Sequence, residues 1–497
     1  MYILSIDQGT TGTTAVLVDA KSLQIVGKVN EEYPQIYPHP GWVEHNLEDI
    51  WNTVKNTVTK VLAVNKVSTD LIKTIGITNQ RETTCAFTKD GEPLANAIVW
   101  QDRRTHDFCK DLVSKGHSEE FKKKTGLPLD PYFSGTKINW LLNNNENVMK
   151  AHEANNLLFG TIDTYLLYKL TGNISHKTDA TNASRTLLMN LETSQWDKTL
   201  INILDIDKET LPTICNSIDS FGLTKNLSFL PDGISINGIL GDQQSALFGQ
   251  ACFNKGEGKC TYGTGAFMLV NTGSEIKYSD NGLLTTVAFR HNNQTTYALE
   301  GSCYIAGACV QWLRDNLQFF ESSPEIEALA LKVDDLSKVR DLLLLPFFTG
   351  LGSPHWIADA KAALVGITRD TGKEEISRVA LEGICFSIND LIKAMRKDMG
   401  SDLDIFKVDG GAVSNDLLMQ IQSEISKIPI VRPTVIETTA YGAALAAAIG
   451  ANLITMDSIR TIWKEDKKFI SSNDNTNSNY FSYKEQQWDS YINKLFK

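Results

Sequence analysis

The sequence predicts an α/β protein built from two halves of related design, and three observations carry this expectation. The chain has 497 residues, enough for about two to four domains of ordinary size. Apolar residues make up 42% of it and charged residues 22%, the profile of a globular protein with large buried cores. A pattern of strand, glycine- and threonine-rich turn and second strand occurs at residues 3–18 and again at 260–270. We place the boundary near Gly249, which gives domains 1–249 and 250–497.

Charge, hydropathy and cysteine usage exclude several classes of protein. The formal net charge of −11 argues against a protein that coats nucleic acid or anionic membranes. No apolar run approaches the ~20 residues that span a bilayer, and the alanine-rich stretch Ala443–Ile449 predicts a packed helix instead. The eight cysteines form no Cys-x-x-Cys pair, which is typical of buried thiols in a reducing compartment. We therefore expect a cytoplasmic protein with no membrane span and no nucleic-acid partner.

The first half opens with two strands joined by a turn. The apolar runs Ile3–Ile6 and Ala15–Val18 flank the sequence Asp-Gln-Gly-Thr-Thr-Gly-Thr-Thr at residues 7–14, which predicts a hairpin. Apolar residues then recur at the helical period from Ile50 to Val61 behind Asn46, a good capping residue. Residues 74–78 predict a further buried strand.

The second half repeats this opening. Cys260–Tyr262 and Ala266–Val270 flank Gly-Thr-Gly at residues 263–265, and strands are predicted at 283–289 and 296–299. A helical period from Ile376 to Ile388 precedes a strand at Ile405–Val408, which ends in Asp-Gly-Gly. The polar stretch 471–479 predicts a surface loop before a C-terminal helix.

Both turns have the chemistry of phosphate-binding loops. Glycines let backbone amides approach an anion, threonine hydroxyls add donors, and Asp7 stands at the end of the first strand, where it can orient the waters of Mg²⁺. Neither turn has the spacing of a P-loop, and no Gly-x-Gly-x-x-Gly follows the first strand, so a P-loop enzyme and a Rossmann dehydrogenase are disfavoured. Asp242 follows the apolar run 234–240, where α/β proteins gather active-site residues. Taken singly, the turns could be plain turns and Asp242 a helix cap.

Motifs along nearly the whole chain, from Ile3 to about Leu453, resemble those of one enzyme family. They are Asp7–Thr11, Pro40–His45, Gly76–Thr84, Ile98–Trp100, Asp130–Ser134, Thr181–Thr186, Gly241–Gln244, Tyr262–Gly265, Asp409–Ala412 and Thr438–Ala444. In this order they are similar to the carbohydrate-kinase family that holds glycerol, xylulose, ribulose and gluconate kinases, and within it most of all to the glycerol kinases.

The resemblance implies a fold and a reaction. The fold is a pair of actin/hexokinase-like (ribonuclease H-like) domains around a hinged cleft, with the polyol, the first phosphate loop and the catalytic aspartate in the N-terminal domain and the nucleotide against the C-terminal domain. The implied reaction is the ATP-dependent phosphorylation of glycerol to sn-glycerol 3-phosphate, which enters glycerol catabolism and glycerolipid synthesis, with ATP and Mg²⁺ as cofactors. Relatives commonly assemble as homodimers or homotetramers, and we expect the same here.

The resemblance also implies roles by position. Asp242 is expected to be the base for the attacking hydroxyl, and Asp7 and Asp242 are expected to act on Mg²⁺ through water. Glycerol is expected to contact Arg81, Glu82, Trp100, Tyr132, Asp242, Gln243 and Phe267, whose donors, acceptors and rings suit three hydroxyls on a short carbon chain. The nucleotide is expected to contact Thr10, Thr11, Gly12, Thr13, Thr264, Gly307, Gln311, Gly411 and Asn415.

The first loop departs from the family pattern. It usually ends in arginine or lysine, but Thr14 stands there, and Gly12 stands where serine is common. Because a cation at a transferred phosphate contributes strongly to rate, we expect slower turnover or greater reliance on Mg²⁺. A catalytically weak or regulatory relative and a kinase of another polyol are the alternatives. Residues 230–233 lack the arginine of a bisphosphate-binding loop, so control by fructose 1,6-bisphosphate is expected to be absent.

Overall fold

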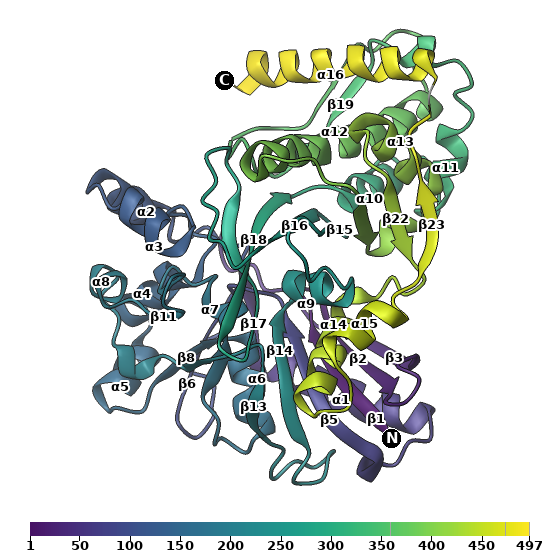
Figure 1. The fold of residues 1–497 in the computed structure, drawn as a ribbon. Helices are drawn as coiled ribbons and strands as arrows, with labels where there is room; N and C mark the ends of the chain where they lie inside the picture. Colours follow the sequence, from purple (N-terminus) through teal and green to yellow (C-terminus); the bar gives the residue numbers. More distant parts are fainter. Residues whose placement is uncertain (358, 473, 497) are drawn as a thin grey trace.

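The computed structural model describes residues 1–357, 359–472 and 474–496. Two large sheets, one in each half, form its frame (Figure 1). The N-terminal sheet has the order β13-β14-β5-β1-β2-β3, and the C-terminal sheet has the order β17-β18-β16-β15-β21-β22-β23. Reading from β3 and from β18, both sheets pass through two antiparallel, two parallel and one antiparallel pairing. This shared topology confirms the predicted pair of related α/β halves.

The N-terminal sheet is built from the hairpin and strands that the sequence predicts. Its strands are β1 (Tyr2–Gln8), β2 (Gly12–Asp19), β3 (Ile25–Glu32), β5 (Ile72–Asn79), β13 (Ile218–Leu223) and β14 (Ser235–Gly241). Helix α1 (Leu47–Val64) packs against β2 and β3. It begins where the Asn46 side chain accepts hydrogen bonds from the backbone N–H groups of Glu48 and Asp49, as predicted. Its buried apolar face shares a core with α6 (Ile162–Leu170).

A segment between β5 and β13, joined by a short strand that precedes α1, adds a smaller sheet with helices beside it. The sheet has the order β4-β7-β6-β8 and buries a separate apolar core with its helices. Its elements are β4 (Glu44–His45), β6 (Thr84–Phe87), β7 (Ala97–Ile98), β8 (Leu158–Thr161), α2 (His106–Ser114), α3 (Ser118–Thr125), α4 (Ser134–Asn144), α5 (Glu146–Glu153) and α8 (Lys198–Ile203). The segment also contains β9 (Lys177–Asp179), α7 (Ala180–Ala183), β10 (Met189–Asn190), β11 (Gln195–Trp196) and β12 (Thr213–Cys215).

The C-terminal sheet starts with the second predicted hairpin. Its strands are β15 (Gly258–Tyr262), β16 (Ala266–Gly273), β17 (Leu284–His291), β18 (Gln294–Cys303), β21 (Phe406–Asp409), β22 (Ile430–Pro433) and β23 (Glu465–Phe469). Its helices are α10 (Gly307–Asp315), α11 (Glu325–Ala330), α12 (Lys373–Met399), α13 (Asp416–Ser426) and α16 (Asn475–Phe496), with the short strands β19 (Leu343–Leu345) and β20 (Ala363–Val365). The long α12, predicted from its period, lies in the centre of the largest core.

Two helices join the halves. Helix α9 (Asp242–Gly249) follows β14, and α14 (Thr438–Gly450), late in the chain, packs on α9 and on β1, β5 and β14 of the N-terminal sheet (Figure 1). The contact is close, since a Cβ at Gly76 would lie 2.1 Å from the carbonyl oxygen of Ala443. The predicted alanine-rich helix is thus confirmed, and α15 (Met456–Ile462) follows it. The carboxyl ends of β1 and β14 come to lie at this junction.

One predicted loop is shorter than expected. Helix α16 begins at Asn475, so most of the polar stretch 471–479 is helical. The carboxylate of Asp474 accepts a hydrogen bond from the backbone N–H of Thr476 at 2.8 Å, and Tyr480, Phe481 and Trp488 bury one face of the helix. Tertiary packing therefore overrides the polar composition. Within the residues described, no helix is both long enough and apolar enough to cross a membrane. All eight cysteines are free, and all but Cys215 are buried.

Candidate active site

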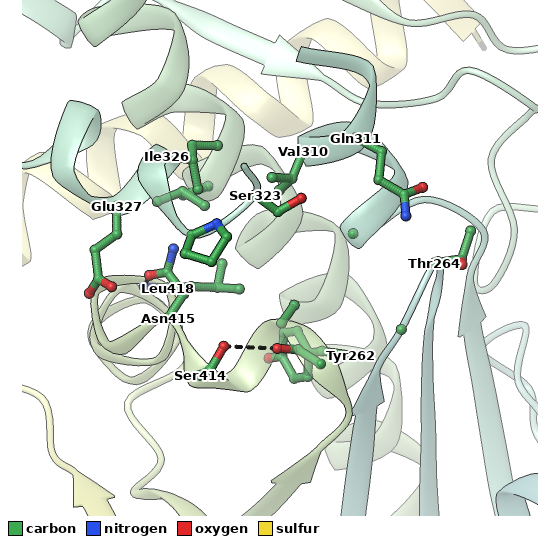
Figure 2. A pocket seen from close by; sticks show the side chains of 16 residues that line it. Tyr262, Thr264, Val310, Gln311, Ser323, Ile326, Glu327, Ser414, Asn415 and Leu418 are labelled. Atoms are coloured by element: carbon green, nitrogen blue, oxygen red, sulfur yellow. Dashed lines mark hydrogen bonds between the residues drawn. The ribbon is translucent and has the colours of Figure 1, made fainter. Parts of the chain in front are cut away.

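A cavity of about 340 Å³ lies beside the turn between β15 and β16 (Figure 2). Figure 2 shows Thr264 and Gln311 on one side of it and Asn415 on the other. Five of the residues expected at the nucleotide line the cavity: Thr264, Gly307, Gln311, Gly411 and Asn415. Its volume is in the range of small-molecule binding sites.

Two glycines shape this cavity. The backbone N–H of Gly307 donates to the carbonyl of Gly263 at 2.9 Å, and a Cβ at Gly307 would lie 2.6 Å from that carbonyl oxygen. Helix α10 can therefore rest on the turn only with glycine at its first position. At Gly411 a Cβ would meet no atom within 4 Å, so the backbone there faces open space. Gly307 therefore fixes the turn against α10, and Gly411 leaves open backbone on the cavity wall.

Polar side chains hydrogen-bond to the turn of the first hairpin. The Tyr33 hydroxyl lies 2.6 Å from the carbonyl oxygen of Gly9 and 2.8 Å from that of Thr10, and Gln35 donates to the latter at 3.0 Å. The Thr10 hydroxyl accepts the indole N–H of Trp100 at 2.9 Å. Thr11, at the turn, is exposed. The backbone of the turn is thus fixed, the Thr10 hydroxyl is bound, and none of the described residues hydrogen-bonds to the Thr11 hydroxyl.

Gly12 and Thr13 also have structural roles. A Cβ at Gly12 would lie 2.8 Å from the carbonyl oxygen of Glu31, so glycine permits the close approach of β3. The Thr13 side chain is buried against α1, with its hydroxyl 2.8 Å from that of Thr53. Successive side chains in a strand alternate between faces, so the Thr13 hydroxyl points toward α1. Any contact of Thr13 with the nucleotide would therefore use its backbone and not its hydroxyl.

A buried ring of charges lies at the end of β5. The Arg81 guanidinium donates to both carboxylate oxygens of Glu300, at 2.6 and 2.9 Å. Arg185 donates from Nε to Glu82 at 2.6 Å and brings Nη2 to 3.2 Å from Glu300. Burial opposes ionisation of Glu300, but the guanidinium groups of Arg185 and Arg81 hold its pKa below the ordinary value. At Glu82 the effect of burial exceeds the opposing effect of Arg185 and Arg81, and the pKa of Glu82 is raised.

Three aromatic rings stand beside this charge ring. The Trp100 ring centroid lies 5.6 Å from that of Tyr132 and 6.4 Å from that of Phe267, both in edge-to-face geometry. Arg185 lies over the Tyr132 ring at 5.6 Å. Phe267 comes from β16, three residues after Thr264, so the rings connect the first hairpin, through Trp100, with the second.

Asp242 is the first residue of α9 and touches the charge ring. Its Oδ1 accepts the backbone N–H of Gln243 at 2.7 Å and lies 3.1 Å from Nε of Arg81. In the part of the chain that the structure describes, no residue donates a hydrogen bond to Oδ2. The side chain is 29% exposed. One carboxylate oxygen is therefore fixed, and the other is open to a ligand.

Lys259, on β15, links the C-terminal sheet to Gln243, the residue that follows Asp242. Its buried ammonium donates to the Gln243 side chain at 2.5 Å and to the Thr261 hydroxyl at 2.7 Å, and Thr261 donates to Asp409 at 2.5 Å. Burial lowers the pKa of Lys259. The start of α9 is thereby tied to the strands of the C-terminal sheet.

The seven residues expected at glycerol thus form one connected cluster, but the sequence analysis missed three of its supports: Arg185, Lys259 and Glu300. Lys259 and Glu300 are the one charged residue in each of the largely buried strands β15 and β18, which is a signal that could have found them. Arg185 lies within a matched motif but received no role.

The acidic residues near Asp7 fit a hydrated Mg²⁺. Burial raises the pKa of Asp7, the negative charges of Glu437 and Asp242 raise it further, and Lys28 lowers it. The Thr78 hydroxyl, opposite Asp7 on β5, is buried without a hydrogen-bond partner. No three acidic, histidine or cysteine side chains among the described residues are grouped closely enough to hold a metal ion. Such a site suits Mg²⁺, which keeps several waters and uses one or two carboxylates with substrate phosphates.

Two sheets of one topology, a cavity beside a glycine-rich hairpin and carboxylates at the junction define a two-domain phosphotransferase of the actin/hexokinase-like architecture. Residues 2–249 match the N-terminal domain, and residues 258–451 the C-terminal domain, of the FGGY family of carbohydrate kinases. The chain belongs to this family.

Relatives that match this chain over nearly its full length are named glycerol kinases. A glycerol kinase from Myxococcus xanthus is 48% identical over 94% of both chains. One from Desulforamulus reducens is 49% identical over 95% of this chain and 93% of the relative. The crystal structure of Plasmodium falciparum glycerol kinase with ADP superposes with a TM-score of 0.90 at 36% identity, covering 100% of this chain and 98% of that one. A xylulose kinase from Lactobacillus acidophilus, at 24% identity and a TM-score of 0.87, shares the fold.

Proposed function

We propose that this chain phosphorylates glycerol, transferring the γ-phosphoryl group of ATP to a terminal hydroxyl and yielding sn-glycerol 3-phosphate and ADP. One observation carries the proposal: the seven side chains expected at glycerol belong to a single connected cluster, in which Asp242 keeps one carboxylate oxygen open. The glycerol kinases that match nearly the whole chain support the choice of substrate.

The cluster has the groups that a small polyol needs. Arg81 can donate to its oxygens, Glu82 can accept from its hydroxyls, and Tyr132 can do either. The rings of Trp100 and Phe267 can cover the carbon chain and exclude water. Because the polar groups are buried, an analogue that lacks a partner hydroxyl leaves them unpaired and is rejected.

Asp242 is proposed as the general base. Arg81 and the start of α9 fix Oδ1, so Oδ2 is free to accept the proton of the attacking hydroxyl. As this proton leaves, the substrate oxygen forms its bond to the γ-phosphorus, and the bond from that phosphorus to the bridging oxygen of ADP breaks. In-line phosphoryl transfer is mostly positioning and charge neutralisation, which places the main demand on the fixed geometry of this carboxylate.

The nucleotide is proposed to bind with its base and sugar in the 340 Å³ cavity and its phosphates toward the two hairpins. Thr264 would meet the phosphates from the C-terminal half, and Thr11 from the N-terminal half. Asp7 and Asp242 would hold Mg²⁺ through water, and bound Mg²⁺ would neutralise the β- and γ-phosphates.

A coupled ADP-release assay tests the proposal. Purified protein with Mg-ATP is given glycerol, erythritol, xylulose or ribulose at equal concentrations. Glycerol should give the highest kcat/KM, and 31P NMR should detect a glycerol phosphate. A preference for a pentulose would favour another branch of the family, and ADP release with none of them would favour a regulatory relative. Sedimentation of the same sample would check the expected homodimer or homotetramer.

A further inference from the structure

The first hairpin has no positive charge of its own. Residues 8–14 contain neither lysine nor arginine. In the sheet, Asp7 stands opposite Thr14, and Thr14 stands opposite Asn30, so the three side chains form a row on one face. The Thr14 hydroxyl accepts a hydrogen bond from the Asn30 amide at 2.9 Å. This row borders the proposed phosphate site. It consists of one carboxylate, that of Asp7, and the two uncharged side chains of Thr14 and Asn30, so it contains no positive charge.

A lysine lies next to this row. Lys28 is two residues before Asn30 on β3, and side chains two apart in a strand share a face. Its ammonium forms an ion pair with Glu437, the residue before α14. The two side chains are 45% and 32% exposed. Lys28 thus reaches from the N-terminal sheet to the residue that precedes α14.

Lys28 lies within the electrostatic field of the same site. Its positive charge acts on Asp7 in opposition to Glu437 and Asp242. The other cation near Asp242, Arg81, is committed to Glu300 through both terminal nitrogens. Lys259 is committed to Gln243 and Thr261. Lys28 has one exposed carboxylate partner and a flexible stem, so it can be redirected at small cost.

We propose that Lys28 is the cation of the first phosphate loop: on binding of Mg-ATP it leaves Glu437 and contacts the terminal phosphate. The exchange is favourable because an exposed ion pair contributes little, whereas a charge-assisted hydrogen bond to a phosphate is strong. Lys28 would then supply the charge that Thr14 does not. This role rests on the proposed kinase function. It predicts that the first phosphate loop has a positive charge available when Mg-ATP is bound, although Thr14 supplies none.

The competing explanation is structural. The Lys28–Glu437 pair could simply tie β3 to α14. In that case loss of Lys28 or of Glu437 would lower stability equally, would affect nucleotides of every phosphate length alike, and would not be repaired by a cation placed elsewhere.

The experiment combines binding and turnover. Lys28→Met, Lys28→Arg, Glu437→Gln and the double variant Lys28→Met/Thr14→Arg are compared with the wild-type protein. Lys21→Met is the matched control, since Lys21 is exposed on the turn between β2 and β3 and forms no ion pair with any described residue. Calorimetry gives the affinity for AMP, ADP and ATP in the presence of Mg²⁺, steady-state kinetics give kcat/KM for Mg-ATP, and thermal melts give stability.

If Lys28 binds the phosphate, Lys28→Met weakens ATP binding more than AMP binding and lowers kcat/KM about 100- to 1,000-fold. Lys28→Arg and the added Thr14→Arg restore most of the loss, while Glu437→Gln does not reproduce it. The proposal is overturned if Lys28→Met stays within twofold of wild type, if AMP and ATP weaken equally, or if Thr14→Arg restores nothing. If the wild-type protein phosphorylates no polyol, the proposed function fails, yet the dependence of binding on phosphate length still decides the role of Lys28.

Discussion

Glu300 offers the sharpest test of the buried charge ring. Its carboxylate is fully buried, accepts two hydrogen bonds from Arg81 and lies 3.2 Å from Arg185. Glu300→Gln keeps the shape and one acceptor oxygen but removes the charge between two buried guanidinium groups. Removing one partner from a buried ion pair costs about 3–5 kcal/mol, and we expect a loss in the free energy of unfolding within this range.

The pH dependence provides a second signature. Despite burial, Arg185 and Arg81 hold the pKa of Glu300 below its ordinary value of 4.5. The stabilisation is therefore fully present above pH 4.5 and is lost as the pH falls through the lower, folded value. The Glu300→Gln variant should lack this part of the acid destabilisation.

Urea unfolding followed by tryptophan fluorescence, at pH 7 and at pH 4, measures both effects. Glu119→Gln, at an exposed glutamate on α3, is the control and should unfold like the wild-type protein. The KM for glycerol should rise in Glu300→Gln, since Arg81 loses the partner that fixes it. An unfolding midpoint equal to that of Glu119→Gln would refute the reasoning.

Two further predictions concern the support of the first hairpin. Trp100→Phe keeps the ring contacts with Tyr132 and Phe267 but loses the hydrogen bond to Thr10, so kcat/KM for Mg-ATP should fall about 2- to 10-fold; an unchanged value in steady-state kinetics would contradict this. Nε2 of His45 lies 2.8 Å from the side-chain oxygen of Gln35, which in turn donates to the Thr10 carbonyl of the hairpin. Burial lowers the pKa of His45 from 6.5 to about 4, so the unfolded chain binds its proton first and stability should fall as the pH drops from 6.5 toward 4. His45→Gln should flatten urea-midpoint profiles in that window, and a profile parallel to wild type would count against it.

The local elements of the fold were predictable from the sequence because their signals are local. Apolar runs around glycine- and threonine-rich turns located both hairpins, and the helical period behind Asn46 located α1. The start of α16 was not predictable in the same way, because the helix is held by buried side chains that contact residues far away in the sequence: Tyr480 hydrogen-bonds to Glu382, and Trp488 to Asp390.

The site was predictable only in part. Motif order placed Asp242, Arg81 and the cavity residues, but the ring of Arg81, Glu82, Arg185 and Glu300 joins positions up to 219 residues apart, and no local pattern specifies such pairs. The packing of α14 on the N-terminal sheet is equally non-local. Thr13 shows a second limit of local pattern: its residue type suits a phosphate loop, but strand alternation turns its hydroxyl toward α1.

Replacement of the proposed base tests the account most directly. Asp242→Asn keeps Oδ1 beside Arg81 and the start of α9, so the protein should fold and bind glycerol with nearly the wild-type affinity. Because general-base catalysis contributes about 10²- to 10⁴-fold, kcat for glycerol with Mg-ATP should drop at least 100-fold. A variant that binds glycerol normally and still turns over within a few-fold of the wild-type rate would contradict the central claim that Oδ2 of Asp242 receives the proton.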